Sequence, residues 1–423
     1  MGTPLEVAMY VATAAREGRF VAIEKLFAPP LRAVVSADAV EAAWTAEVGR
    51  IGSVTSIGGP VSEPMDGGLT RVRVPVTCER GSLTLIMSVD SEGLLNGLRL
   101  DPGATVEWTP PAYADPASFT EYEVTLEGGI HAVQGTLSLP GDRSPAVILL
   151  SGGGPFDRDE TSGPNKPLKD LAWGLASKGI AVLRFDKVTA SRPDLTSHAG
   201  FTATAEYLPH TLAAIDVLRR HPTVDPDRIF LVGHSMGGKL APRIAAVSPY
   251  VAGLAILAGD TQPMQQAAIR VAKYLASTQP SKAADAFVET LIRQAKNVES
   301  PDLSESTPPA DLPFGFSGSY WLDLREYDPV ATAAALDRPI LILQGGRDYQ
   351  VTTTDDLINW QTGLAHRPDV TIHIHEADNH LFFAGAAPST MADYTTAQHV
   401  DPAVVDDITS WINSTAEAQA KQA

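Results

Sequence analysis

Short apolar runs alternate with helix-like stretches from Tyr122 onward, and this alternation constrains the fold more than any other feature. A helix-like stretch near Leu168–Ser177 leads to IAVLRFD, and another near Leu208–Arg220 leads to RIFLV; PAVILL and VAGLAIL are further runs of this kind. Strands that are apolar on both faces belong inside a sheet, and intervening helices make neighbouring strands parallel. The pattern predicts an α/β fold with a parallel sheet covered on both faces.

The alternation breaks between Gly259 and Arg338. A helical stretch from about Met264 to Asn297 is followed there by a polar loop and by the aromatic run FGFSGSYWLDL. The strand pattern then returns with PILILQG and VTIHIHE, and an amphipathic helix lies near Val404–Ile412. We therefore expect an insertion at about residues 261–336.

The first 103 residues follow a different pattern, that of a separate α+β unit. Apolar positions have helical spacing from Leu5 to Phe27 and again at about Ala37–Val48. Four runs with β-branched alternation follow, separated by Gly, Asp and Ser, which predicts an antiparallel meander. The stretch 104–117 is rich in Pro, Ala and Asp, so we interpret it as a linker, with the domain boundary near residue 112.

Composition limits which binding partners and which cellular compartment are expected for this chain. The 423 residues include 32 Lys and Arg against 50 Asp and Glu, a net charge of −18. Such a chain repels phosphate backbones and anionic lipid surfaces, so neither nucleic acid nor a membrane is an expected partner. Three features favour the cytoplasm: there is a single cysteine, Cys78, the start does not resemble a secretory signal, and no long apolar run is free of charges.

The segment RIFLVGHSMGG places Gly233, Ser235 and Gly237 in a G-x-S-x-G pattern between an expected strand and an expected helix. A nucleophilic hydroxyl at the tip of a sharp turn needs small neighbours, which glycines provide. The first amide of the helix, at Met236, would then face the developing oxyanion. A tight glycine turn with an exposed serine is the alternative interpretation.

A serine nucleophile needs a base, and a histidine base needs an acid to orient it. In chains with this serine turn the order is serine, acid, histidine. Asp348 follows PILILQGGR and His380 follows VTIHIHEADN, in that order. Asp260, Asp323 and Asp328 are the rival acids.

The stretches GHSMGG, LQGGRDYQV and DNHLFF resemble the three signature stretches of the α/β-hydrolase superfamily, over about residues 118–415. The resemblance implies a catalytic domain at residues 118–418 with a helical lid at the insertion, and a Ser235–His380–Asp348 triad. It also implies an oxyanion donor in the loop SGGGPFDRDE, at Gly153 or Gly154. Family members often have a histidine where this loop has Ser151.

The first unit resembles the nuclear-transport-factor-2-like cone that precedes the catalytic part of some bacterial hydrolases. Enzymes built on such a cone, cyclases or dehydratases for example, usually need a His or Asp inside the pocket, and this unit contains no histidine. We expect a packing domain or a homodimer contact, with a binding pocket as the alternative.

Three other polar clusters have interpretations other than catalysis. The run HIHEADNH resembles a metal motif of metallo-β-lactamase-like hydrolases, but its spacing differs by one residue, and no metal or organic cofactor is expected. His234 is interpreted as a packing residue more than a catalytic one. The triplet Asp157–Arg158–Asp159 is interpreted as a structural charge network with Arg184 and Asp186.

The expected activity is hydrolysis of a small-molecule carboxylic ester through an acyl-enzyme. A thioesterase, peptidase or acyltransferase could use the same triad, and a non-catalytic binding protein is the alternative from another class. The aromatic residues of the insertion indicate either an apolar pocket wall or ordinary lid packing: Phe314, Phe316, Tyr320 and Trp321. An acidic surface with an apolar lid favours an uncharged or cationic ester of moderate size.

Overall fold

The computed structural model describes residues 2–65, 68–79, 81–102 and 108–420. The chain divides into two compact units, Met1–Glu107 and Trp108–Ala423. Residues 104–107 of the predicted linker lie outside the described residues. Residues 108–117 pack on the second unit, because Trp108 Nε1 donates a hydrogen bond of 2.8 Å to Asp170 and the Tyr113 ring packs against its core.

The first unit combines helices with an antiparallel sheet in which β3 pairs with β1, β2 and β4, and β4 pairs with β5. Alternate residues of β3 and β4 point inward, and Cys78 is buried at the end of β3. The predicted helix Leu5–Phe27 is divided, because Gly18 adopts a left-handed φ of 71° after α1. The elements are α1 (Pro4–Arg16), α2 (Phe20–Glu24), α3 (Pro29–Val34), α4 (Ala37–Ile51), β1 (Val54–Ile57), β2 (Val61–Pro64), β3 (Thr70–Cys78), β4 (Gly81–Val89) and β5 (Leu95–Pro102). The likeness to a nuclear-transport-factor-2-like cone stays a prediction.

The second unit is built on a sheet with the strand order β13-β12-β11-β10-β8-β9-β7-β6. From β13 to β9 the neighbours are parallel, whereas β7 is antiparallel to both β9 and β6. The predicted parallel sheet is thus confirmed, with an antiparallel hairpin at one edge. The strands are β6 (Phe119–Leu126), β7 (Val133–Pro140), β8 (Ser144–Leu150), β9 (Ala181–Phe185), β10 (Val224–His234), β11 (Val251–Leu257), β12 (Ile340–Gly345) and β13 (Val370–His375).

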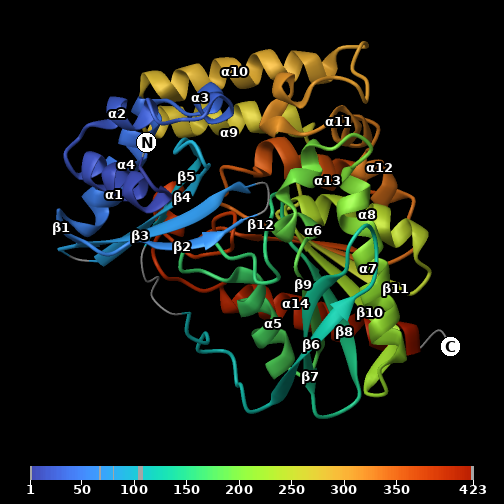
Figure 1. Ribbon diagram of the computed structural model, residues 1–423. Coiled ribbons are helices and arrows are strands. Elements are labelled where there is room, and N and C mark those ends of the chain that lie inside the picture. Colours follow the sequence, from blue (N-terminus) through green and yellow to red (C-terminus); the bar gives the residue numbers. More distant parts are fainter. Residues whose placement is uncertain (1, 66–67, 80, 103–107, 421–423) are drawn as a thin grey trace. The chain divides into compact units, whose positions relative to one another are not determined.

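Helices cover both faces of this sheet (Figure 1). Every residue of β8 is buried; Ile148 belongs to the core under α7 and α8, and its neighbours Val147 and Leu149 belong to the core under α5 and α14. This explains why the strand is apolar without interruption. The helices and helical turns outside the insertion are α5 (Pro167–Ser177), α6 (Val188–Ser191), η2 (Pro193–Ser197), α7 (Ala203–Arg220), α8 (Met236–Val247), η5 (Thr353–Leu357), α13 (Ile358–Gly363), η6 (Met391–Tyr394) and α14 (Pro402–Ala420).

The insertion lies between β11 and β12 and is helical. The single helix expected from Met264 to Asn297 is two helices, because the chain turns at Pro280 and the Ser281 side chain caps the second one. Its elements are α9 (Met264–Thr278), α10 (Lys282–Glu299), η3 (Pro309–Asp311), η4 (Pro313–Gly315), α11 (Gly318–Arg325) and α12 (Pro329–Ala334).

Among the described residues, no helix combines the length and the apolar character that crossing a membrane requires.

Candidate active site

The serine turn joins β10 to α8, as the sequence predicts. Ser235 has φ 51° and ψ −119°, which is a strained conformation for a residue with a side chain. A Cβ at Gly233 would overlap the carbonyl oxygen of Gly237, and a Cβ at Gly237 would lie 2.5 Å from the carbonyl oxygen of Leu150. Both glycines are therefore required by close backbone approach, and the turn holds Ser235 at the carboxyl edge of the sheet.

Asp348 and His380 meet in the structure although 32 positions separate them. Asp348 follows β12 and His380 follows β13, and Asp348 Oδ2 lies 2.7 Å from His380 Nδ1. The other carboxylate oxygen, Oδ1, accepts the amide N–H groups of Gln350 at 2.7 Å and Val351 at 3.0 Å. The Asp348 side chain is fully buried, so the acid is fixed on both oxygens and its ion partner is the histidine ring.

Each of the three rival acids has another partner. Asp260 accepts from Lys239 Nζ at 2.6 Å, and Asp323 accepts from Arg243 at 2.8 Å. Asp328 caps α12 by accepting the amide of Ala331 at 2.9 Å.

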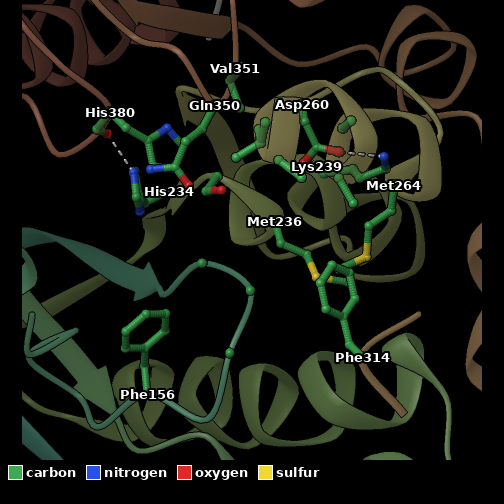
Figure 2. A pocket seen from close by; sticks show the side chains of 18 of the residues that line it. Phe156, His234, Met236, Lys239, Asp260, Met264, Phe314, Gln350, Val351 and His380 are labelled. Carbon is green, nitrogen blue, oxygen red and sulfur yellow. Dashed lines mark hydrogen bonds and ion pairs between the residues drawn. The ribbon is translucent and has the colours of Figure 1, made fainter. Parts of the chain in front are cut away.

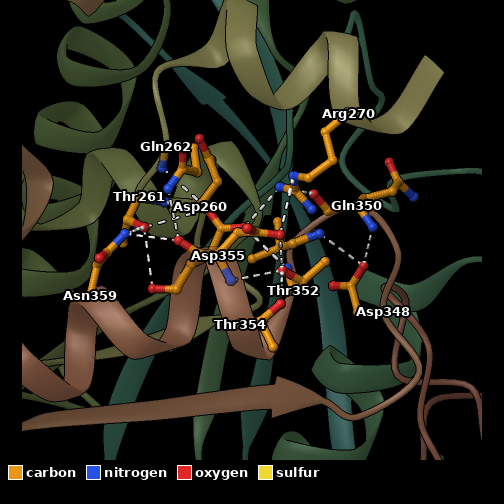
Figure 3. Close-up of polar contacts among 12 residues, drawn as sticks. Asp260, Thr261, Gln262, Arg270, Asp348, Gln350, Thr352, Thr354, Asp355 and Asn359 are labelled. Carbon is orange, nitrogen blue, oxygen red and sulfur yellow. Dashed lines mark hydrogen bonds and ion pairs between the residues drawn. The ribbon is translucent and has the colours of Figure 1, made fainter. Parts of the chain in front are cut away.

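The loop that carries Asp348 is tied to the insertion through a buried carboxylate, Asp356. Figure 3 shows Arg270, Thr261 and Thr352, which bond to it. Asp356 accepts from Arg270 Nη2 on α9 at 2.9 Å and from the amides of Thr261 and Thr352 at 3.0 Å each. Arg270 also donates to the carbonyl oxygen of Gln350. The base of α9 and the turn beyond Asp348 therefore form one hydrogen-bonded assembly.

The two predicted oxyanion donors lie next to each other. A Cβ on Gly153 would be 3.4 Å from Met236 Sδ and 3.7 Å from Met236 Cβ, which places the glycine loop against the start of α8. Among the described residues, neither the Gly153 amide nor the Met236 amide donates to another group. Two free N–H groups beside a strained serine match an oxyanion site. Gly154 lines the same cavity but has a φ of 126°.

His234 does more than pack. Its Nδ1 lies 2.9 Å from Glu160 Oε1, its Nε2 lies 2.8 Å from the carbonyl oxygen of His380, and its ring centroid is 4.7 Å from that of His380. Glu160 Oε1 also accepts the amide of Gly152 at 2.8 Å. Burial acts to lower the pKa of His234, but the Glu160 carboxylate, together with the His380 carbonyl and the Asp348 charge, more than offsets this, so the pKa of His234 is raised. One buried carboxylate thus connects the glycine loop, the serine turn and the His380 loop.

The histidines of the HIHEADNH run do not converge on one point: two share a carboxylate, and the third pairs with a different one. His373 Nδ1 lies 2.8 Å from Asp407, and His375 Nε2 lies 3.2 Å from the same carboxylate, whereas His380 contacts Asp348. Among the residues that the structure describes, no group of three or more potential ligands is arranged to hold a metal ion.

Two residues of the predicted triplet, Arg158 and Asp159, form the expected charge network, whereas Asp157 accepts the amide of Thr161 at 2.9 Å. Arg158 pairs with Asp186 at 3.0 Å, and Arg184 pairs with Asp159 at 2.9 Å. Arg184 also pairs with Glu121 of β6 at 2.8 Å. These pairs shape the loop from behind and do not involve the triad.

Ser235 and His380 line a mostly apolar cavity of about 570 Å³. Figure 2 shows His234 and His380 on one side of it and Met264 and Phe314 on the other. Its wall comes largely from apolar side chains of α9 and α10, which the sequence analysis did not single out: Ala267, Ala268, Val271, Ala272, Leu275, Phe287 and Leu291. Lys239 and Asp260 also line the cavity and form an ion pair with each other.

Two of the four predicted aromatic wall residues are placed elsewhere. Phe314 and Phe316 line the cavity as predicted. Tyr320 instead borders a smaller neighbouring cavity of about 210 Å³, and its hydroxyl donates to buried Glu206 at 2.7 Å. Trp321 is buried in the core and lines neither cavity. The short helix α11 turns these two rings inward, so they serve packing.

A doubly covered sheet, a strained serine turn and a buried acid–histidine pair define a class of proteins, and comparisons agree with that class. A model of the alpha/beta hydrolase family matches residues 147–393. Esterase EstD of Thermotoga maritima is 35% identical over 337 residues, covering 79% of this chain and 77% of that protein. The chain belongs to the α/β-hydrolase family.

Two further similarities are more limited. A putative esterase, NocK of Nocardia uniformis subsp. tsuyamanensis, is 32% identical over 154 residues, covering 34% of this chain and 42% of that protein. Among solved structures, Est1E from Butyrivibrio proteoclasticus matches with a TM-score of 0.44 and 13% identity, over 70% of this chain and 99% of that chain.

Proposed function

We propose that this protein is a serine esterase that hydrolyses carboxylic esters through an acyl-enzyme. The observation that carries the proposal is the 2.7 Å contact between His380 Nδ1 and Asp348, at the cavity that Ser235 also lines. A fixed acid at Nδ1 leaves Nε2 as the basic nitrogen, which is the state a serine nucleophile needs. The 35% identity to a protein named an esterase supports the ester as substrate.

In the proposed mechanism Ser235 Oγ attacks the ester carbonyl carbon and gives its proton to His380 Nε2. The amides of Met236 and Gly153 bind the oxyanion, and the Asp348 carboxylate stabilises the imidazolium. Collapse of the intermediate breaks the bond to the alcohol, which takes the proton from His380. A water molecule then attacks the acyl-enzyme with His380 as base again, which releases the acid and restores Ser235.

The cavity sets the substrate class of the proposal. A volume of about 570 Å³ suits a small molecule, and the lining is mostly apolar, with the Lys239–Asp260 pair and the Glu160–His234 pair among its polar groups. We therefore propose an uncharged ester of moderate size, with one apolar group against α9 and α10.

The test is the variant Ser235→Ala, assayed with nitrophenyl esters of increasing acyl length and with a fluorophosphonate probe. We expect turnover to fall by about 10⁴-fold or more, since the nucleophile and its base act as a unit, and the probe to label only the wild type. Ser248→Ala, a buried serine at the end of α8, is the matched control and should keep both activities. Labelling or turnover that survives in Ser235→Ala would refute the proposal.

A further inference from the structure

The peptide bond between Gly152 and Gly153 has charged partners on its inner side. Its N–H group, on Gly153, is a proposed oxyanion donor, and its carbonyl oxygen, on Gly152, points away from the cavity into the protein. That oxygen accepts from Lys187 Nζ at 3.0 Å and from the Tyr207 hydroxyl at 2.7 Å. Both acceptor positions of the carbonyl are therefore occupied.

Lys187 is fixed in place by its surroundings. Its side chain is 3% exposed, and its three N–H bonds have three acceptors: the Gly152 carbonyl at 3.0 Å, the Tyr207 oxygen at 2.8 Å and Glu206 Oε1 at 3.1 Å. Burial lowers the pKa of Lys187, and the Glu206 carboxylate opposes that shift. The ammonium is the form that satisfies all three acceptors.

Glu206 is in turn held by two hydroxyl groups. Thr189 Oγ1 donates to its Oε1 at 2.5 Å, and the Tyr320 hydroxyl donates to its Oε2 at 2.7 Å. All of these groups are buried. An ion pair with this many fixed partners gives Lys187 one position, directly behind the glycine loop.

A donor at a carbonyl strengthens the N–H group of the same peptide, because the two ends of the amide polarise each other. A cation does this more strongly than a neutral hydroxyl. On the other side, Glu160 accepts the Gly152 amide at 2.8 Å and so fixes the preceding peptide. The Gly152–Gly153 peptide is therefore both oriented and polarised before any substrate binds.

We propose that Lys187, with Tyr207, is a positioning residue that polarises the Gly152–Gly153 peptide and strengthens Gly153 N–H as the oxyanion donor. This inference rests on the proposed esterase function. It assigns a positioning role to a buried ion pair, Lys187–Glu206, that has no hydrogen bond to Ser235 or His380 within the described part of the chain.

The test variant replaces the whole ion pair by neutral groups, Lys187→Met with Glu206→Gln, so that no buried charge is left unpaired. Tyr207→Phe removes the hydroxyl that donates to the Gly152 carbonyl and accepts from Lys187 Nζ, and it leaves both charges of the ion pair in place. The matched control is Arg243→Met with Asp323→Asn, which neutralises another ion pair of this unit, with a length of 2.8 Å, away from the glycine loop. Circular dichroism and thermal unfolding establish that each variant is folded.

The readouts are kcat, KM and the inhibition constant of an alkylboronic acid, which forms a tetrahedral anionic adduct with a serine. For Lys187→Met/Glu206→Gln we expect kcat to fall and the boronic acid constant to rise, each about tenfold, with KM within about twofold. For Tyr207→Phe we expect kcat to fall and the boronic acid constant to rise about threefold, and the control variant should have the wild-type values of both. An unchanged kcat, or a lower kcat with unchanged boronic acid affinity, would overturn the inference.

A second readout does not depend on turnover. Glycine labelled with ¹³C at the carbonyl and ¹⁵N at the amide gives NMR signals that select peptide bonds between consecutive glycines. We expect the Gly152–Gly153 amide proton to move upfield in the Lys187 variant, while the Gly345–Gly346 signal stays in place. An unmoved Gly152–Gly153 signal overturns the inference even if the wild type hydrolyses esters. If the wild type neither turns over esters nor binds the boronic acid, the proposed function fails, and the NMR shift still decides the polarisation.

Discussion

Two parts of the cavity are stabilised by different interactions. The floor consists of the glycine loop, the serine turn and the loops of Asp348 and His380, and the wall consists of α9 and α10. Buried ionic groups hold the floor in one geometry, with Glu160, Lys187 and Asp348 each bonded to at least two fixed partners. Apolar side chains of α9 and α10 form the wall, and among the described residues of these helices few are fully buried. Rigid charged groups suit transition-state stabilisation, whereas an apolar wall suits recognition by shape. Substitutions in the floor should therefore change kcat, and substitutions in the wall should change substrate preference.

The largest expected effect comes from Asp348→Asn in the floor. An amide at this position cannot act as the acid partner of His380 Nδ1 and favours the wrong tautomer, so we expect kcat to fall by about 10⁴-fold with KM little changed. Steady-state kinetics with a nitrophenyl ester measures both. Asp407→Asn, which removes the carboxylate partner of His373 and His375, is the control and should keep its activity. A loss below tenfold in Asp348→Asn would mean that another acid orients His380.

Glu160→Gln should have the second largest effect, because Glu160 connects three loops of the floor. We expect kcat to fall by about 10- to 100-fold, as small displacements of catalytic groups are costly. Since Glu160 raises the pKa of His234, the stability from their attraction is fully present below the unfolded histidine pKa, about 6.5, and is lost as pH rises through the higher folded pKa. Unfolding should therefore show a larger loss for Glu160→Gln at pH 6, on the order of 3 kcal/mol, than at pH 9.

The control for that comparison is Glu121→Gln, which weakens the pairing of Arg184 and does not contact the His234 pair. Its stability loss should not follow the titration of a histidine. Equal losses for Glu160→Gln at both pH values would show that His234 is uncharged in the wild type.

The sequence predicts the wall's location and the triad better than it predicts the rest of the floor. Unbroken apolar strands fix a parallel sheet, and chain order then puts Ser235, Asp348 and His380 at its carboxyl edge. Glu160, Lys187 and Glu206 carry no periodic signal, because each partner lies on a different element and the pairing depends on the finished fold. Lys187 lies two positions after the end of the buried strand β9, beyond Asp186, and this position is the one signal that the sequence carries for it.

The aromatic run of the insertion is a case in which the sequence indicated more cavity residues than the structure contains. Composition indicated an apolar wall, but only Phe314 and Phe316 face the cavity, while Trp321 is in the core. Which ring of a short helix points inward depends on where that helix packs. Four closely spaced aromatic residues do not form an apolar face with helical spacing, so the sequence does not show which of them line the cavity.

The loop leading to His380 contains a buried carboxylate, Asp378, without a hydrogen bond to any described residue. Asp378 is fully buried, neither oxygen has a hydrogen bond within the described chain, and His375 Nδ1 is 4.0 Å away. Burial raises its pKa to about 7, Asp401 adds to this, and Arg347 opposes it. The folded state thus holds the proton more tightly than the unfolded state, so stability falls as pH rises from about 4 to about 7.

Asp378→Asn removes that titration. We expect the stability of the variant relative to wild type to rise by on the order of 2 to 3 kcal/mol between pH 5 and pH 8, measured by urea unfolding. Activity should change less than in Glu160→Gln, because Asp378 bonds to no group of the triad in the described structure. A variant that is destabilised equally at both pH values would show that the carboxylate is charged and paired in the folded protein.

The smallest expected effect belongs to the wall. Val271 on α9 lines the cavity, and Val271→Phe would fill part of the space that an apolar group of the substrate occupies. We expect kcat/KM to fall about fivefold for octanoyl esters and to stay within about twofold for acetyl esters, as a change of pocket volume by a few carbon atoms discriminates modestly. Lys273→Phe, at an exposed position of the same helix, controls for the added ring and should alter neither. If Val271→Phe lowers kcat equally for both esters, α9 contributes to the rigid floor, and the division between floor and wall fails at this helix.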